Sequence, residues 1–375
     1  MSQRFTLDGS EALENELEQS CHEIAREVAR IVPSEMLQAL VLCGGYGRGE
    51  GGVLKTEKGD RPYNDLEFFL FIRGLARINE HRFGSAIHAL EQKMTAKIGI
   101  DIEFKISSVE TIAQGETTMF SYDLVQGHRV FLGPEDVLQT SQHHTDARKI
   151  PLHEVTRLLM NRCSGLLFAK SRLLASDFSQ GDADFVLRNI RKAQLAMGDA
   201  ILAMEGRYHW SCRKRQEELI HHGHLFMPKE ELERHHREGV EFKLHPRQAV
   251  ESREELSCLH QKVVDLAWSV FAFVEMKRLR RSFADPAMYL TSGDKCPETN
   301  QVKNALIRLR CFGWRGWKNG LAFRYPREAL LHAMVVLLWR PEEVDYGFLS
   351  KQWVQTVSDW QQAVEWYQKL WNRFN

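Results

Sequence analysis

The sequence has no excess of charge of either sign and no long apolar run. Its 375 residues include 50 Lys and Arg and 50 Asp and Glu, so the formal net charge is zero. Proteins that coat nucleic acid or an anionic membrane normally carry a clear positive excess. No stretch approaches the roughly 20 consecutive apolar residues that cross a bilayer. The composition therefore argues against a membrane partner and against a nucleic-acid partner.

Cysteine is scarce and has no pattern. The seven cysteines include no Cys-x-x-Cys pair, which is typical of reduced thiols rather than of a disulfide framework. The first 17 residues are polar and acidic and lack the basic and then apolar segments of a secretory signal. We therefore expect a soluble, cytoplasmic protein.

Two common catalytic motifs are also missing. There is no Gly-x-Ser-x-Gly elbow to hold a nucleophilic serine, and no Gly-Lys-Thr/Ser phosphate-binding loop. These absences argue against serine hydrolases and against P-loop nucleotide hydrolases.

The chain is long enough for two domains. Near residue 145 the spacing of its apolar residues changes from a mixture of strand-like and helical patterns to a mainly helical pattern. Before that point, apolar spacing predicts a helix over residues 10–32, with Ser10 as its N-cap. Short apolar or alternating runs predict strands over residues 39–43, 66–72 and 98–106. We expect an α+β fold, with a small mixed-sheet domain over residues 1–145 and an all-α helical domain over residues 146–375.

The helical half offers weaker functional signals. Apolar residues from Leu349 to Phe374, several of them Trp, keep three-four spacing, which predicts a core-facing helix rather than a stacking platform. The basic stretch 213–237 is expected to be an exposed connection. Lys192 and Asp199 could face a cleft, although a salt-bridged helix face is favoured. Adjacent histidines lack metalloprotease spacing and are expected at the surface: His143, His144, His221, His222, His224, His235 and His236.

The most informative stretch follows the first predicted strand. Gly44 and Gly45 leave backbone amides uncovered, so that phosphate oxygens could bind there, and Arg48 adds a planar cation nearby. Asp65 and Glu67 lie two apart on the second strand and so share one face. Two carboxylates on one face repel each other, and a divalent cation relieves that repulsion. The third strand adds Asp101 and Glu103, again two residues apart.

The pattern Gly-Gly-Tyr-Gly-Arg-Gly-Glu over residues 44–50, followed by Asp65-x-Glu67, resembles the signature of the DNA polymerase beta-like nucleotidyltransferase superfamily. The residues of this motif are most similar to those of bacterial protein uridylyltransferases and adenylyltransferases, and the whole chain is similar to uncharacterised bacterial nucleotidyltransferases. The resemblance implies that Gly44, Gly45 and Arg48 bind the nucleotide phosphates. It also implies that Asp65, Glu67 and Asp101 bind Mg²⁺ and are the catalytic carboxylates, with Asp101 as candidate base.

The sequence departs from that signature in three ways. Residues 51–63 lengthen the spacing between Gly45 and Asp65, which indicates an inserted loop or hairpin. The second acid is Glu67 where Asp is common. Glu103 competes with Asp101 as the third carboxylate, although the apolar residues before Asp101 favour Asp101.

The resemblance implies a Mg²⁺-dependent nucleotidyltransferase whose helical domain completes the substrate cleft. It would move a nucleoside monophosphate from a nucleoside triphosphate to a hydroxyl and release pyrophosphate. Because the neutral charge argues against a nucleic-acid acceptor, a small molecule or a protein is the expected acceptor. The alternative is a catalytically inactive nucleotide-binding sensor or interaction protein with the same fold.

Overall fold

The computed structural model describes residues 4–226, 228–317 and 323–374. Its contacts divide the chain into two compact units. Unit 1 comprises the chain up to Pro151 together with Leu202–His224 and Arg237–Arg247. Unit 2 comprises Leu152–Ile201, Leu225–His236 and the chain from Gln248 onward. Unit 1 thus combines the sheet with two later segments from the helical half.

Unit 1 contains a small mixed sheet, which agrees with the expected α+β class. Its strands are β1 (Leu37–Leu42), β4 (Leu66–Ile72), β5 (Ile102–Ser107) and β6 (Arg129–Leu132). They are ordered β5-β4-β1-β6. Strand β1 is antiparallel to both β4 and β6, whereas β4 and β5 are parallel. The strand β6, which the sequence did not indicate, completes one edge.

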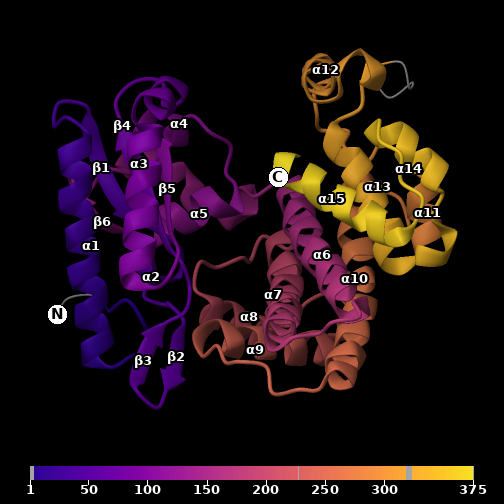
Figure 1. Cartoon of the computed structure of the whole chain (residues 1–375), viewed down its shortest axis with the longest axis horizontal. Helices are drawn as coiled ribbons and strands as arrows, with labels where there is room; N and C mark the ends of the chain where they lie inside the picture. Colours follow the sequence, from indigo (N-terminus) through magenta and orange to yellow (C-terminus); the bar gives the residue numbers. More distant parts are fainter. Residues whose placement is uncertain (1–3, 227, 318–322, 375) are drawn as a thin grey trace. The chain divides into compact units, whose positions relative to one another are not determined.

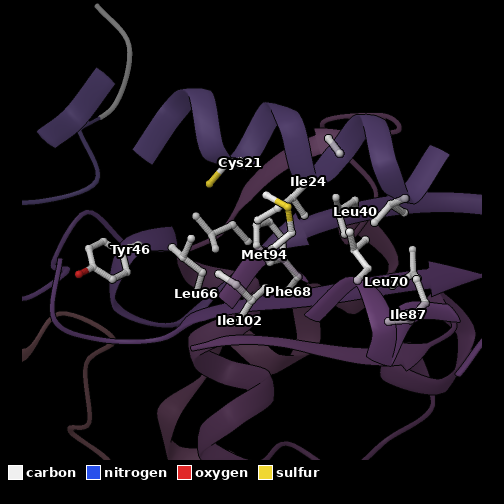
Figure 2. Close-up of a cluster of buried hydrophobic side chains, with 14 of the residues drawn as sticks. Cys21, Ile24, Leu40, Tyr46, Leu66, Phe68, Leu70, Ile87, Met94 and Ile102 are labelled. Atoms are coloured by element: carbon white, nitrogen blue, oxygen red, sulfur yellow. The ribbon is translucent and has the colours of Figure 1, made fainter. Parts of the chain in front are cut away.

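Helices cover both faces of this sheet (Figure 1). They are α1 (Glu11–Ile31) and α3 (Ala76–Ile98) on one face and α4 (Val109–Ala113) and α5 (Met119–Gln126) on the other. Unit 1 also contains α2 (Gly44–Gly47), α8 (Cys212–His222) and 3₁₀ turns at Gln139–Thr145 and Ala147–Lys149. Ser10 caps α1 by accepting a hydrogen bond from the Leu13 amide, as predicted. Figure 2 shows Cys21 and Ile24 of α1 and Met94 of α3 over Leu40 and Phe68 of the sheet. The opposite face of the sheet is apolar around Phe69 and Phe71, which pack with Leu124 of α5.

The third predicted strand begins later than expected. Ile98 is the last residue of α3, and Gly99 ends that helix with a left-handed φ of 83°, a conformation that glycine adopts without steric cost. Strand β5 therefore starts at Ile102, and Asp101 precedes it. The apolar residues before Asp101 are not a strand segment, so that reason for preferring Asp101 over Glu103 was wrong.

The residues that lengthen the spacing between Gly45 and Asp65 form a hairpin, which is one of the two structures predicted for them. Strands β2 (Val53–Thr56) and β3 (Gly59–Pro62) pair with each other. The buried hydroxyl of Tyr46 donates to the Gly52 carbonyl and accepts from the Tyr63 amide, each at 2.9 Å. A Cβ on Gly51 would lie 2.0 Å from the Tyr46 ring, so only glycine fits beside it. Tyr46 therefore holds both ends of the hairpin at one point.

Unit 2 is helical in its described residues. It contains α6 (Leu152–Leu174), most of α7 (Gln180–Met204), the first half of α9 (Lys229–Leu244), α10 (Arg253–Leu279), α11 (Pro286–Thr291), α12 (Gln301–Trp317), α13 (Pro326–Trp339), a 3₁₀ turn at Pro341–Glu343, α14 (Tyr346–Trp353) and α15 (Trp360–Phe374). Helix α6 packs against α10 and α13, and α13 also packs against α15. Among the described residues, no helix is both long and apolar enough to cross a membrane.

Several expectations for the helical half need correction. The aromatic stripe is core-facing, since Trp353 and Tyr367 are buried. However, it belongs to two helices, because Val354 adopts a left-handed conformation that ends α14. Residues 213–237 lie largely in α8 and α9 rather than in an exposed connection, and Arg215 is 2% exposed.

The expectation that the histidine pairs lie at the surface was wrong for most of them. His144, His224, His235 and His236 are buried. His144 bonds with the Thr117 hydroxyl and the Ile112 carbonyl, which satisfy its ring nitrogens inside unit 1. His236 lies 3.0 Å from Asp199, so Asp199 is part of a buried pair inside unit 2. A buried histidine is stable where both ring nitrogens have partners, and local sequence spacing does not reveal those partners.

Candidate functional site

The candidate site lies in unit 1, where β1 runs into the glycine turn and β4 lies beside it. Gly44 has a φ of +67°, and a Cβ built on it would lie 3.0 Å from the Glu67 carboxylate. Glycine is therefore required at residue 44 both for its backbone conformation and to leave room for this acid. The amides of Gly44 and Gly45 make no hydrogen bond within the described part of the chain. They remain available to an anionic ligand.

Gly45 differs from Gly44 in what surrounds it. A Cβ on Gly45 would lie 3.1 Å from the Glu50 carbonyl oxygen and 3.4 Å from the Gly51 Cα. A larger side chain there would press on the Glu50–Gly51 backbone, so it would lower stability as well as ligand binding.

Glu67 lies among like charges with little water around it. Burial and the carboxylates of Asp65 and Glu103 raise the pKa of Glu67 to about 7, and Arg48 only partly opposes this. A carboxylate that is costly to ionise becomes favourable to ionise when a cation binds beside it. The charge state of this carboxylate is thus linked to whatever cation the site holds.

The strand register identifies which acid is nearest to Glu67. In the parallel β4–β5 pair, Glu67 is opposite Glu103, and neighbouring strands are about 4.8 Å apart. Asp101 lies directly before β5, and its carbonyl accepts a hydrogen bond from the Leu66 amide at 2.9 Å. The structure therefore places Glu103 opposite Glu67 and Asp101 beside Asp65, at the start of β4.

The residues present fit a magnesium ion in a limited sense. Within the described ranges, no group of three His, Cys, Asp or Glu side chains is disposed to hold a metal by itself. Mg²⁺, however, is usually held by one or two carboxylates, water and the phosphates of a substrate rather than by an all-protein cage. Asp65 and Glu67 are such a pair of carboxylates, and burial first and then the charge of Asp65 raise the pKa of Glu67.

Arg48 connects the glycine turn to α5. Its guanidinium forms an ion pair with Asp123 at 3.1 Å, and both side chains are largely buried. It also lies near enough to Glu67 to favour the ionised carboxylate. Its role as a phosphate ligand stays a prediction, whereas its contact with Asp123 is a feature that the motif alone did not reveal.

A segment that begins more than 80 residues after Asp123 extends this network. The Tyr208 hydroxyl donates to Asp123 at 3.3 Å, and the Arg215 guanidinium lies 4.8 Å from the centre of the Tyr208 ring. Arg215 is almost fully buried and donates to the His209 and Trp210 carbonyls. This segment therefore adds a second arginine to the site.

Glu50, the last residue of the glycine-rich motif, holds that segment in place. Its carboxylate accepts hydrogen bonds from the Ser211 hydroxyl and from the Cys212 amide, the latter at 2.8 Å. These donors form the beginning of α8, where a negative charge is favourable. Although burial opposes ionisation, the bond from Ser211 and the nearby Lys243 keep the pKa of Glu50 below its ordinary value.

Lys243, near the end of α9, adds a half-buried positive charge. Its ammonium favours the ionised forms of both Glu67 and Glu50, and its carbonyl oxygen lies 2.9 Å from where a Gly52 Cβ would be. Within the described part of the chain, this ammonium has no hydrogen bond or ion pair. Sequence reasoning missed Lys243, Asp123, Tyr208 and Arg215, because no motif links them to the glycine turn.

Replacing Glu50 with glutamine is expected to loosen α8. A hydrogen bond to a charged group contributes about 1.5–3 kcal/mol. Glutamine would place an NH₂ group, which cannot accept, against one of the two donors, so one of these hydrogen bonds would be lost. We expect a lower unfolding midpoint and faster hydrogen–deuterium exchange in α8. Glu57→Gln, at the exposed hairpin tip, is the matched control. Unchanged exchange in α8 would show that Glu50 does not anchor it.

In comparisons with known proteins, the chain matches no family model and no curated protein.

Proposed function

We propose that this protein is a Mg²⁺-dependent nucleotidyltransferase that moves a nucleoside monophosphate from a nucleoside triphosphate to a hydroxyl of a small molecule or a protein. The observation that carries the proposal is the pair Asp65 and Glu67, two mutually repelling carboxylates beside a glycine turn with free amides. A cation-binding acid pair next to an anion-binding turn suits a substrate that carries phosphates together with a divalent ion.

Each residue of the site would have its own role in the proposed transfer. Asp65 and Glu67 would hold Mg²⁺, which supplies charge neutralisation on the phosphates. The amides of Gly44 and Gly45 would donate to phosphate oxygens, and Lys243 would balance the negative charge of the triphosphate. A carboxylate of β5 would accept the proton of the attacking hydroxyl as its oxygen bonds to the α-phosphorus. The bond from that phosphorus to the β-phosphate bridging oxygen breaks, and pyrophosphate leaves.

The test combines binding with turnover. The purified protein is incubated with each of the four ribonucleoside triphosphates, labelled at the α-phosphate, with and without Mg²⁺. Release of pyrophosphate or labelling of the protein or an added acceptor would support transfer. Mg²⁺-dependent binding without pyrophosphate release from any acceptor would favour a nucleotide sensor. Failure of all four triphosphates to bind would contradict the proposal.

The β5 carboxylates can be ranked by substitution. Because Glu103 is opposite Glu67 in the parallel register, we expect Glu103→Gln to lower turnover by on the order of 100-fold, as for loss of a general base. Asp101→Asn, just outside β5, should have a much smaller effect. The measurement is pyrophosphate release at saturating triphosphate. The reverse order would restore Asp101 as the third carboxylate and base.

A further inference from the structure

The zero net charge of the chain is the sum of two opposite parts. Residues 277–327 contain 12 of the 50 Lys and Arg residues but only three of the 50 Asp and Glu residues. This segment therefore carries a formal charge of +9, and the rest of the chain carries −9. The total charge of the chain therefore conceals a local excess of positive charge.

The few acids in this segment are already engaged. Asp285 caps α11, Asp294 accepts a hydrogen bond from the Cys296 amide, and Glu298 pairs with Arg278. By contrast, five exposed cations in the segment have no ion pair within the described part of the chain: Lys277, Arg280, Arg281, Lys303 and Arg310. Their charge is presented to solvent without local neutralisation.

Helix α12 carries two of these cations on one exposed face together with apolar groups. Lys303 and Arg310 lie seven residues, or about two turns, apart. Val302 and Leu306 share this face and are 67% and 62% exposed. The opposite face is buried through Ala305 and other residues, so α12 is fixed to unit 2 while this face stays open.

The end of α12 adds an aromatic group. After a kink at Gly313, where φ is 61°, Trp314 is 73% exposed. The sequence of α12 contains no Asp or Glu. We define the α12 face as Val302, Lys303, Leu306 and Arg310, with Trp314 at its end.

We propose that the α12 face binds single-stranded nucleic acid, RNA and DNA alike, because phosphates and bases are common to both. Unpaired cations bind phosphates, and an exposed tryptophan stacks on a base, which together are the features of single-strand binding surfaces. A helix that lies on an anionic membrane keeps its charged residues on the face opposite its apolar one. In α12, Val302, Leu306, Arg310 and Lys303 instead lie side by side within about 100° on the one exposed face, which favours a nucleic acid over a lipid surface.

The test measures binding of a fluorescein-labelled 20-nucleotide RNA, and of a single-stranded DNA of the same sequence, by polarisation, without triphosphate or Mg²⁺. We expect binding that weakens as KCl rises from 50 to 200 mM, since bound phosphates release counterions. The double variant Lys303→Gln/Arg310→Gln should weaken binding about tenfold or more and flatten the salt dependence. Trp314→Ala should weaken it about fivefold or more, and Trp314→Phe should retain most of it.

The control variant removes two positive charges, as the test variant does, but from another part of unit 2. Arg188→Gln/Lys262→Gln alters two exposed cations outside the basic segment, and we expect it to bind RNA like the unaltered protein. Equal weakening by the control pair would overturn the α12 face. No RNA binding, or stronger binding to phosphatidylserine vesicles than to RNA, would also overturn it. Because the assay contains no nucleotide or metal, its result does not depend on the proposed transferase activity.

Discussion

Replacing Asp65 with asparagine is expected to lower Mg²⁺-dependent nucleotidyl transfer by about 100-fold or more while the protein stays folded. Asparagine keeps the volume of the side chain but removes a negative oxygen ligand. Loss of a metal contact worth several kcal/mol to the transition state corresponds to at least this change in rate. The measurement is pyrophosphate release at several Mg²⁺ concentrations.

The fold of this variant is expected to be at least as stable as that of the original protein. Asp65 is one of the charges that raise the pKa of Glu67, so its neutralisation relieves repulsion. Asp136→Asn, an exposed acid in unit 1, is the matched control and should retain turnover. Turnover equal to that of the unaltered protein in Asp65→Asn would remove Asp65 from the metal site.

Replacing Glu67 with glutamine is expected to stabilise the protein above pH 7, by at most about 3 kcal/mol. The folded protein keeps the Glu67 proton up to about pH 7, whereas the ordinary value for glutamate is 4.5. The folded state therefore binds more protons between these values, and stability is lost as pH rises from about 4.5 through 7. Glutamine has no such proton to lose, so it avoids this penalty.

The measurement is the denaturant midpoint at pH 5, 6, 7 and 8, with and without Mg²⁺. The gain from Glu67→Gln should be small at pH 5 and largest at pH 8. Added Mg²⁺ should stabilise the original protein more at pH 8 than at pH 5, because it binds the ionised carboxylate, and should not stabilise the variant in this way. Glu57→Gln serves again as the control. An equal gain at both ends of the pH range would mean that Glu67 titrates normally.

Local sequence patterns predicted the elements whose burial follows a simple period. The helix closed by Pro33 became α1, and the apolar run 66–72 became β4 with the same bounds. Asp65 and Glu67 were expected on one strand, but Asp65 directly precedes β4 and only Glu67 lies in it. The charge of Asp65 nevertheless acts on Glu67 and raises its pKa. These features depend only on neighbouring residues.

The rest of the site depends on contacts between distant segments. Asp123 meets both Arg48 and Tyr208, and Glu50 meets the start of α8, but none of these pairs has a characteristic spacing. The end of α3 was missed for a local reason. Gly99 ends the helix through a left-handed conformation, yet a glycine in an apolar run is equally compatible with a strand. That single residue decides whether Asp101 lies inside β5 or before it.

Because the Tyr46 hydroxyl bonds to both ends of the β2–β3 hairpin, the distance between these ends does not depend on the number of residues in the hairpin. Gly52 and Tyr63 are 11 residues apart, yet both bond to the same oxygen, so the chain leaves and re-enters the candidate site at one place. Whatever lies between them projects outward as a hairpin and need not change the separation of the glycine turn from Asp65. Related chains with shorter or longer hairpins would keep the same acid geometry. The turn between Thr56 and Gly59 is accordingly the point of unit 1 best suited to accept an inserted peptide or a label.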